Sequence, residues 1–136
     1  MERVMRVHDN ITVCAPHLGQ EAVWHGLTHD LEEVEKNLQE MSENRKLMLD
    51  KLGELSILVE YTVPEGAFYV MVRYPGKEKS VEVAWRLLRE KGVVVLPGGI
   101  FGEQGEGHLR LSFGGERVEM LEGLRRFGEW VNEVAN

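Results

Sequence analysis

The chain has 136 residues, of which 43% are hydrophobic and 29% charged, and its 16 basic against 23 acidic residues give a net charge of −7 at pH 7. This length can bury a sizeable core, and the composition is typical of a soluble globular protein rather than a disordered one. Because the basic residues are not clustered and the net charge repels phosphates, we expect no nucleic-acid partner.

Targeting and redox signals are sparse. No apolar run approaches membrane-spanning length, and the N-terminus lacks the apolar stretch of a signal peptide, so we expect no membrane partner. Cys14 is the single cysteine, which excludes an internal disulfide framework and fits a reducing compartment. These features predict a cytoplasmic protein.

The first quarter of the chain has no obvious local partner for its apolar residues. Residues 1–7 predict one or two helical turns, residues 8–19 an irregular connection and residues 20–27 a short helix. We therefore assign residues 1–27 to an N-terminal helical or connecting segment and residues 28–136 to the main domain.

A long helix follows. Asp30 is a reasonable N-cap, Arg45 fills the one gap in an apolar stripe, and Gly53 is expected to stop the helix. We interpret Arg45 as reaching from the stripe edge to a carboxylate of the helix. The stripe consists of Leu31, Val34, Leu38, Met41, Met48 and Leu52.

After Gly53 the pattern changes to strands and one helix. Residues 56–61 are apolar and β-prone, residues 67–74 alternate as a strand, and residues 93–96 form a continuous apolar run that predicts a strand buried on both faces. Between the last two, Ser80 is expected to cap a helix and Gly92 to end it. The predicted buried side of this helix is Val81, Ala84, Trp85, Leu87 and Leu88.

The C-terminal third contains a Gly-rich loop, a strand and a helix. Residues 108–113 alternate apolar and polar side chains, which predicts a half-buried strand. The apolar face of the last helix is predicted to be Val118, Leu121, Leu124, Phe127, Val131 and Val134. The element order predicts an α/β fold (an α+β sandwich), with a small mixed or antiparallel sheet of about four strands and helices packed on one face.

Arg110 lies in the middle of this last strand, on its more polar face, just after the loop of residues 97–107. A guanidinium held by a rigid strand is suited to bidentate binding of a carboxylate. The alternative interpretation is a surface ion pair on an edge strand.

The glycine-rich loop of residues 102–107 gives weaker evidence for a functional site. The loop of residues 102–107 begins like a phosphate-binding loop but lacks the Lys-Ser/Thr that should follow, and we interpret its Glu103 and Glu106 as a solvated acidic loop rather than catalytic carboxylates.

Histidine spacing does not support a metal site. His25 and His29 have metal-ligand spacing, but no third ligand follows at a recognisable distance. Cys14 and His17 could be a nucleophile and base, but no orienting partner is identifiable. We therefore predict no metal site and no catalytic residue.

Three motifs in order, at residues 64–69 (PEGAFY), 93–102 (VVVLPGGIFG) and 107–113 (GHLRLSF), resemble the C-terminal part of class I/II aminotransferases. These are fold-type I enzymes that depend on pyridoxal 5′-phosphate and are related to aspartate aminotransferase. Earlier segments agree, so that the resemblance covers nearly the whole chain: His8-Asp9, Cys14-Ala15-Pro16, Gln20-Glu21-Ala22 and Asn44-Arg45.

The resemblance implies roles for particular residues. Arg110 occupies the position of the arginine that clamps the α-carboxylate of the amino-acid substrate in this family. Phe68 falls where some members place an aromatic ring against the substrate, although a core phenylalanine is an equal alternative. Arg45 inherits no catalytic role, and Gly99 stands where the family has a serine in its Pro-Gly-Ser turn.

The resemblance also implies pyridoxal 5′-phosphate as cofactor. The family's cofactor-attaching lysine, phosphate loop and pyridine-nitrogen aspartate lie upstream, and we expect this chain to begin after them. No lysine of the chain lies in such a motif: Lys36, Lys46, Lys51, Lys77, Lys79 and Lys91. We thus predict no cofactor-binding residue here and no catalysis by the isolated chain.

Two hypotheses follow. In the first, residues 28–136 are the small domain of an aminotransferase that exchanges an amino group between an amino acid and a 2-oxo acid, and its large domain is supplied by another chain or lost by truncation. In the second, the chain is a stand-alone oligomerising module or a truncated gene remnant without catalysis. In either case we expect a homo-oligomer.

Overall fold

The computed structural model describes residues 2–11, 14–29 and 31–135, and divides into two compact units, Met1–Leu38 and Gln39–Asn136. The predicted cap Asp30 lies outside the described residues. The domain boundary predicted between residues 27 and 28 stays a prediction.

The first unit is helical. It contains α1 (Glu2–Ile11), α2 (His17–His29) and the beginning of α3 (Leu31–Glu54), and neither α1 nor α2 contains a buried residue. Helix α1 continues past the predicted residues 1–7 to Ile11, and the Asn10 side chain donates to the Arg6 carbonyl one turn earlier. Residues 8–11 and 17–19 are therefore helical rather than part of an irregular connection.

The second unit is built on a four-stranded antiparallel sheet of order β1-β2-β4-β3. The strands are β1 (Glu60–Tyr61), β2 (Tyr69–Arg73), β3 (Leu96–Pro97) and β4 (His108–Ser112). The predicted fold class is confirmed, and β4 lies inside the sheet rather than at its edge.

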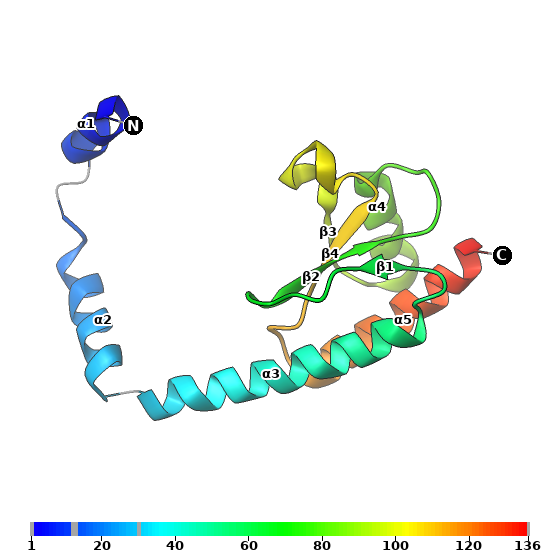
Figure 1. The fold of residues 1–136 in the computed structure, drawn as a ribbon, viewed down its shortest axis with the longest axis horizontal. Coiled ribbons are helices and arrows are strands. Elements are labelled where there is room, and N and C mark those ends of the chain that lie inside the picture. Colours follow the sequence, from blue (N-terminus) through cyan, green and yellow to red (C-terminus); the bar gives the residue numbers. More distant parts are fainter. Residues whose placement is uncertain (1, 12–13, 30, 136) are drawn as a thin grey trace. The chain divides into compact units, whose positions relative to one another are not determined.

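One face of this sheet forms the core (Figure 1). The inward residues alternate along β2 and β4, as Val70, Val72, Leu109 and Leu111. They share a core with the C-terminal half of α3, with α4 (Ser80–Lys91) and with α5 (Arg117–Ala135). The opposite face carries Tyr69, Met71 and Arg110, which are only half-buried.

Two strand predictions are wrong in detail. Only Glu60 and Tyr61 of residues 56–61 pair as a strand. In residues 93–96, Val93 and Val95 are buried but Val94 is 80% exposed. The run lies at the sheet's β3 edge and is covered on one side only, so that a continuous apolar sequence does not mean burial on both faces here.

The predicted apolar faces of the two later helices are right in part: in α5, Leu124, Phe127 and Val131 are buried as predicted. In α4 the buried apolar residues are Val83 and Leu87, whereas Trp85 is about half exposed. In α5 only Val118 of the predicted face is exposed, and Met120 and Trp130 are buried in addition. Each helix carries more apolar residues than its contact with the sheet uses, and tertiary packing selects which line is covered.

Two glycines are predicted to end helices, and one of them does so. Gly92 adopts φ 64°, and its N–H and that of Val93 donate to the carbonyls of Leu88 and Leu87, so it ends α4 as predicted. Gly53 does not stop α3, which runs to Glu54 without a left-handed residue at position 53.

Candidate functional site

The sheet register places Arg110 in the middle of the open face. It lies opposite Met71 of β2 on one side and opposite Leu96 of β3 on the other. Tyr69 lies on the same face as Met71, two residues earlier on β2, which puts it diagonally across from Arg110. A central strand with neighbours on both sides is a rigid support for a binding side chain.

The Arg110 guanidinium contacts two aromatic rings. Its Cζ atom is 4.6 Å from the ring centroid of Tyr69 and 4.6 Å from that of Phe101, within cation–π range. Among the described residues, the Arg110 side chain contacts these two rings and makes no hydrogen bond or ion pair. The predicted alternative of a surface ion pair is therefore wrong.

Most other arginines of the second unit have oxygen acceptors, and the exception among the described residues, Arg89, is exposed. Arg45 donates to the Pro64 carbonyl at 3.0 and 2.7 Å, and Arg73 pairs with Glu60 at 3.4 Å. In a chain with net charge −7, a half-buried guanidinium without a carboxylate stands out. Its N–H donors are available to an anion from outside the chain.

Phe101 is held by the loop between β3 and β4. It closes a short 3₁₀ turn, η1 (Gly98–Phe101), which is followed by a second turn, η2 (Glu103–Gly105). A Cβ atom at Gly98 would collide with the backbone of Gly105, and one at Gly105 with the backbone of Gly98. Glycine is therefore required at both positions for the two turns to pack together.

The same loop is attached to the start of α4 by Glu106. Its carboxylate accepts the Ser80 N–H at 2.6 Å and the Ser80 hydroxyl at 3.2 Å, and that hydroxyl accepts the Gly99 N–H at 3.1 Å. Hydrogen bonds to its carboxylate lower the pKa of Glu106. The bond from the Ser80 N–H has the largest effect, and those from the Gly107 N–H and the Ser80 hydroxyl have smaller ones.

This arrangement corrects two sequence interpretations. Ser80 is the first residue of α4 rather than its N-cap, and the N-cap position, Lys79, makes no side-chain cap bond. Glu106 is not simply solvated. From a loop distant in the sequence, its carboxylate accepts a hydrogen bond from an N–H at the N-terminus of α4.

Phe68 immediately precedes β2. Its side chain is 49% exposed, so the alternative of a core phenylalanine is wrong. Its ring meets that of Tyr69 edge-on, with centroids 5.6 Å apart. The Phe68 carbonyl accepts the Phe113 N–H at 2.9 Å, which ties the residue to the end of β4. Its role against a substrate stays a prediction.

Asn44 is a buried residue that the sequence analysis did not single out on its own. Its amide donates to the carbonyls of Phe113 and Gly115 at 3.3 and 3.2 Å, and its oxygen accepts from Arg117 Nε at 3.0 Å. Asn44 thus anchors the chain just beyond β4. Its neighbour Arg45 donates to the Pro64 carbonyl, not to a helix carboxylate as predicted.

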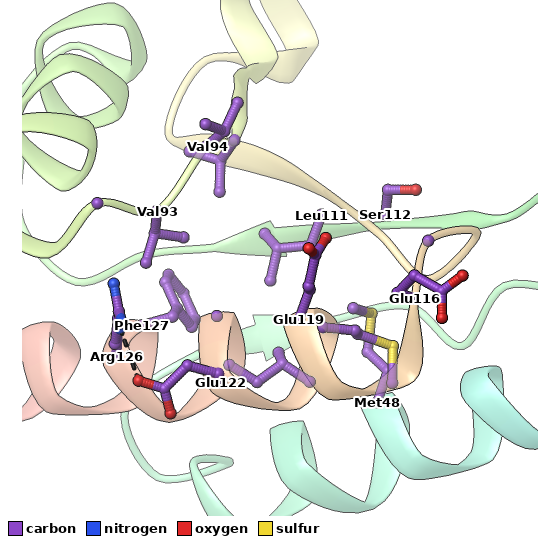
Figure 2. A pocket seen from close by; sticks show the side chains of 16 residues that line it. Met48, Val93, Val94, Leu111, Ser112, Glu116, Glu119, Glu122, Arg126 and Phe127 are labelled. Carbon is purple, nitrogen blue, oxygen red and sulfur yellow. Dashed lines mark hydrogen bonds and ion pairs between the residues drawn. The ribbon is translucent and has the colours of Figure 1, made fainter.

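A pocket of about 470 Å³ lies on the other side of β4, between α5 and residues 92–95 (Figure 2). Three glutamates line it: Glu116, just before α5, and Glu119 and Glu122 of α5. Arg126 donates to Glu122 at 2.7 Å and to the Lys91 carbonyl at 3.2 Å. Hydrogen bonds from Arg125 and then Arg126 lower the pKa of Glu122 to about 2. An acidic lining repels a carboxylate, so this pocket is not the predicted anion site.

The N-terminal candidates do not assemble into a site. The His25 and His29 rings stack with centroids 4.6 Å apart, and the described part of the chain holds no group of three residues suited to bind a metal. The Nε2 atom of His17 lies 3.4 Å from Oε1 of Glu21, and Cys14 is exposed. No helix within the described ranges is long and apolar enough to cross a membrane.

Comparison with known proteins defines the class of this chain. The family model for aminotransferase class I and II matches residues 1–127, so the chain belongs to the class I and II aminotransferase family.

Individual relatives agree with this assignment. The chain is 34% identical over 126 residues to the valine–pyruvate aminotransferase of Mycobacterium tuberculosis, covering 90% of this chain and 32% of that protein. It is 29% identical over 134 residues to the (5-formylfuran-3-yl)methyl phosphate transaminase of Methanocaldococcus jannaschii, covering 98% and 35%. The crystal structure of an aminotransferase from Mycobacterium tuberculosis superposes with a TM-score of 0.82 at 32% identity, covering 93% and 33%. The chain thus spans about a third of the length of its relatives.

Proposed function

We propose that residues 28–136 form the small domain of a pyridoxal-phosphate-dependent aminotransferase, and that Arg110 binds the α-carboxylate of its amino-acid and 2-oxo-acid substrates. The observation that carries the proposal is the half-buried Arg110 guanidinium, which contacts two rings and has no protein acceptor among the described residues. The name of the Mycobacterium tuberculosis relative pairs an amino acid, valine, with a 2-oxo acid, pyruvate.

The surroundings of Arg110 suit this task. A carboxylate is planar and offers two oxygens, which match two parallel N–H donors of the guanidinium. Met71 and Leu96 flank Arg110 with hydrocarbon. Partial burial of the guanidinium beside these side chains strengthens a charge-assisted hydrogen bond relative to one in bulk water.

The cofactor's chemistry requires groups of another kind. When bound, pyridoxal phosphate acts as the electron sink of transamination, and it needs an amine for attachment and donors for its phosphate. The residues around Arg110 offer rings and hydrocarbon but no amine, while Lys51 and Lys91 pair with Glu54 and Glu133. These residues do not fit cofactor attachment, so we place that function in another part of the enzyme.

Titration of the 136-residue chain with L-valine, followed by backbone amide shifts along β4, tests the role of Arg110. We expect saturable shifts in the wild type and binding at least about tenfold weaker in Arg110→Lys, because an ammonium cannot replace the two-pronged donor. The variant should keep the wild-type far-UV spectrum and melting temperature.

Arg73→Lys is the matched control. Arg73 is an arginine of the neighbouring strand with its own carboxylate partner, Glu60, and we expect its replacement to leave valine binding unchanged. Equal binding by wild type and Arg110→Lys would contradict the proposal.

A further inference from the structure

The two rings beside Arg110 come from separate elements, Tyr69 from β2 and Phe101 from the turn η1. We propose that Tyr69 and Phe101 are positioning residues of the carboxylate site, which hold the guanidinium so that its N–H edge, and not its faces, is open to the ligand. The proposal rests on the proposed function of Arg110 and adds two residues to the site.

The geometry of Arg110 differs from that of the other arginines with ring contacts. Arg86 lies over the ring of Trp130 at 5.2 Å, and Arg89 over that of Trp85 at 5.5 Å, one ring each. Arg110 has two rings, each 4.6 Å from its Cζ atom. Two contacts at this shorter distance restrict the rotation of a side chain that otherwise has many rotamers.

Covering the guanidinium with rings has a consequence for binding. Aromatic rings attract the cation but offer no strong acceptor, so they orient the guanidinium without using its N–H donors. The side chain then loses its conformational entropy on folding rather than on binding, and a carboxylate binds to a preorganised donor pair. A carboxylate side chain at either ring position would orient Arg110 equally well but would occupy those donors.

The Phe101 side of the arrangement depends on its loop. The Gly99 N–H donates to the Ser80 hydroxyl at 3.1 Å, and Ser80 in turn is bonded to Glu106. These bonds join the turn η1, which carries Phe101, to the start of α4 and to Glu106 at the other end of the loop. Tyr69 is fixed by its pairing with Ser112 across the sheet.

Nuclear magnetic resonance of the arginine side chains tests the proposal in the full 136-residue chain, without a ligand. We expect slow rotation of the Arg110 guanidinium and a ring-current shift of its Nε–H proton in the wild type. Tyr69→Leu and Phe101→Leu should each speed the rotation and remove part of the shift. Tyr69→Phe keeps the ring and should behave as the wild type.

Valine titration of the same variants supplies the binding readout. We expect each leucine variant to bind about threefold to tenfold more weakly than the wild type. Trp85→Leu is the matched control, since it removes an exposed ring that contacts Arg89 rather than Arg110, and it should change neither the rotation of Arg110 nor valine binding.

The outcomes separate the two proposals. Free rotation of the wild-type guanidinium, or wild-type valine binding in both leucine variants, overturns the positioning role. Slow rotation that both leucine variants release supports that role even if Arg110→Lys binds valine as well as the wild type does, a result that overturns only the carboxylate function.

Discussion

At the scale of single residues, Glu106 shows how a loop carboxylate replaces a missing helix cap. The Ser80 N–H would otherwise point out of the first turn of α4 without an acceptor, because Lys79 makes no side-chain cap bond. A negative charge at this end of a helix also interacts favourably with the helix dipole. One carboxylate therefore stabilises α4 and fixes the loop that carries Phe101.

The pKa of Glu106 predicts a pH dependence for this contact. Its folded-state pKa lies below the ordinary 4.5, so the stabilisation is present above pH 4.5 and is lost as the pH falls through the folded-state pKa. We expect Glu106→Gln to lower the melting temperature at pH 7, and the difference from the wild type to shrink at low pH. Thermal unfolding between pH 3 and 7 measures this.

Glu103 provides the comparison for that experiment. It belongs to the same loop and is exposed, so we expect Glu103→Gln to follow the wild-type curve. A melting-temperature loss in Glu106→Gln that is the same at pH 3 and pH 7 would contradict a role for the ionised carboxylate.

At the scale of elements, β4 links the core to the site. Its alternation sends Leu109 and Leu111 into the core and Arg110 to the open face. Leu109 has no exposed surface, so Leu109→Ala should lower the free energy of unfolding by about 2–5 kcal/mol. Val94 is 80% exposed, and Val94→Ala should stay within about 0.5 kcal/mol of the wild type. Equal losses in urea unfolding would contradict this assignment of faces.

The same elements explain what could be predicted from the sequence. Period-2 alternation identified residues 108–113 as a half-buried strand and placed Arg110 on its polar face, because that pattern depends only on neighbours in the chain. The burial of residues 93–96 could not be read in this way, since an edge strand and a central strand have similar local patterns.

The residues of the candidate site could likewise be predicted only in part from the sequence. Arg110 was identifiable from its place in the strand and its motif, but Tyr69 and Phe101 were not. Their contact with Arg110 arises from the β2–β4 register and from the packing of the 98–107 loop, and both are tertiary features. A tyrosine in alternation with Met71 was the one signal available for Tyr69.

At the scale of the whole molecule, the chain corresponds to about a third of each relative's length. These relatives favour the aminotransferase hypothesis over a stand-alone oligomerising module. The first unit exposes apolar side chains, among them Val23, Trp24 and Leu27. The expected homo-oligomer and large-domain partner stay predictions.

The proposed separation of carboxylate binding from cofactor attachment leads to a prediction about the isolated chain. Mixed with pyridoxal phosphate and reduced with borohydride, the 136-residue chain should show only slow, scattered labelling of its lysines, because the described neighbours of Arg110 (Tyr69, Phe101, Met71 and Leu96) include no amine. Peptide mass spectrometry identifies the labelled positions. Stoichiometric labelling of a single lysine would contradict the prediction.

The most direct test of the account compares L-valine with isobutylamine, which is the same amine without the carboxylate, while observing the Nε–H signal of Arg110. We predict that L-valine shifts this signal saturably and that isobutylamine leaves it unchanged. A similar response to both compounds, or a response to neither, would show that Arg110 does not bind the substrate carboxylate in this chain.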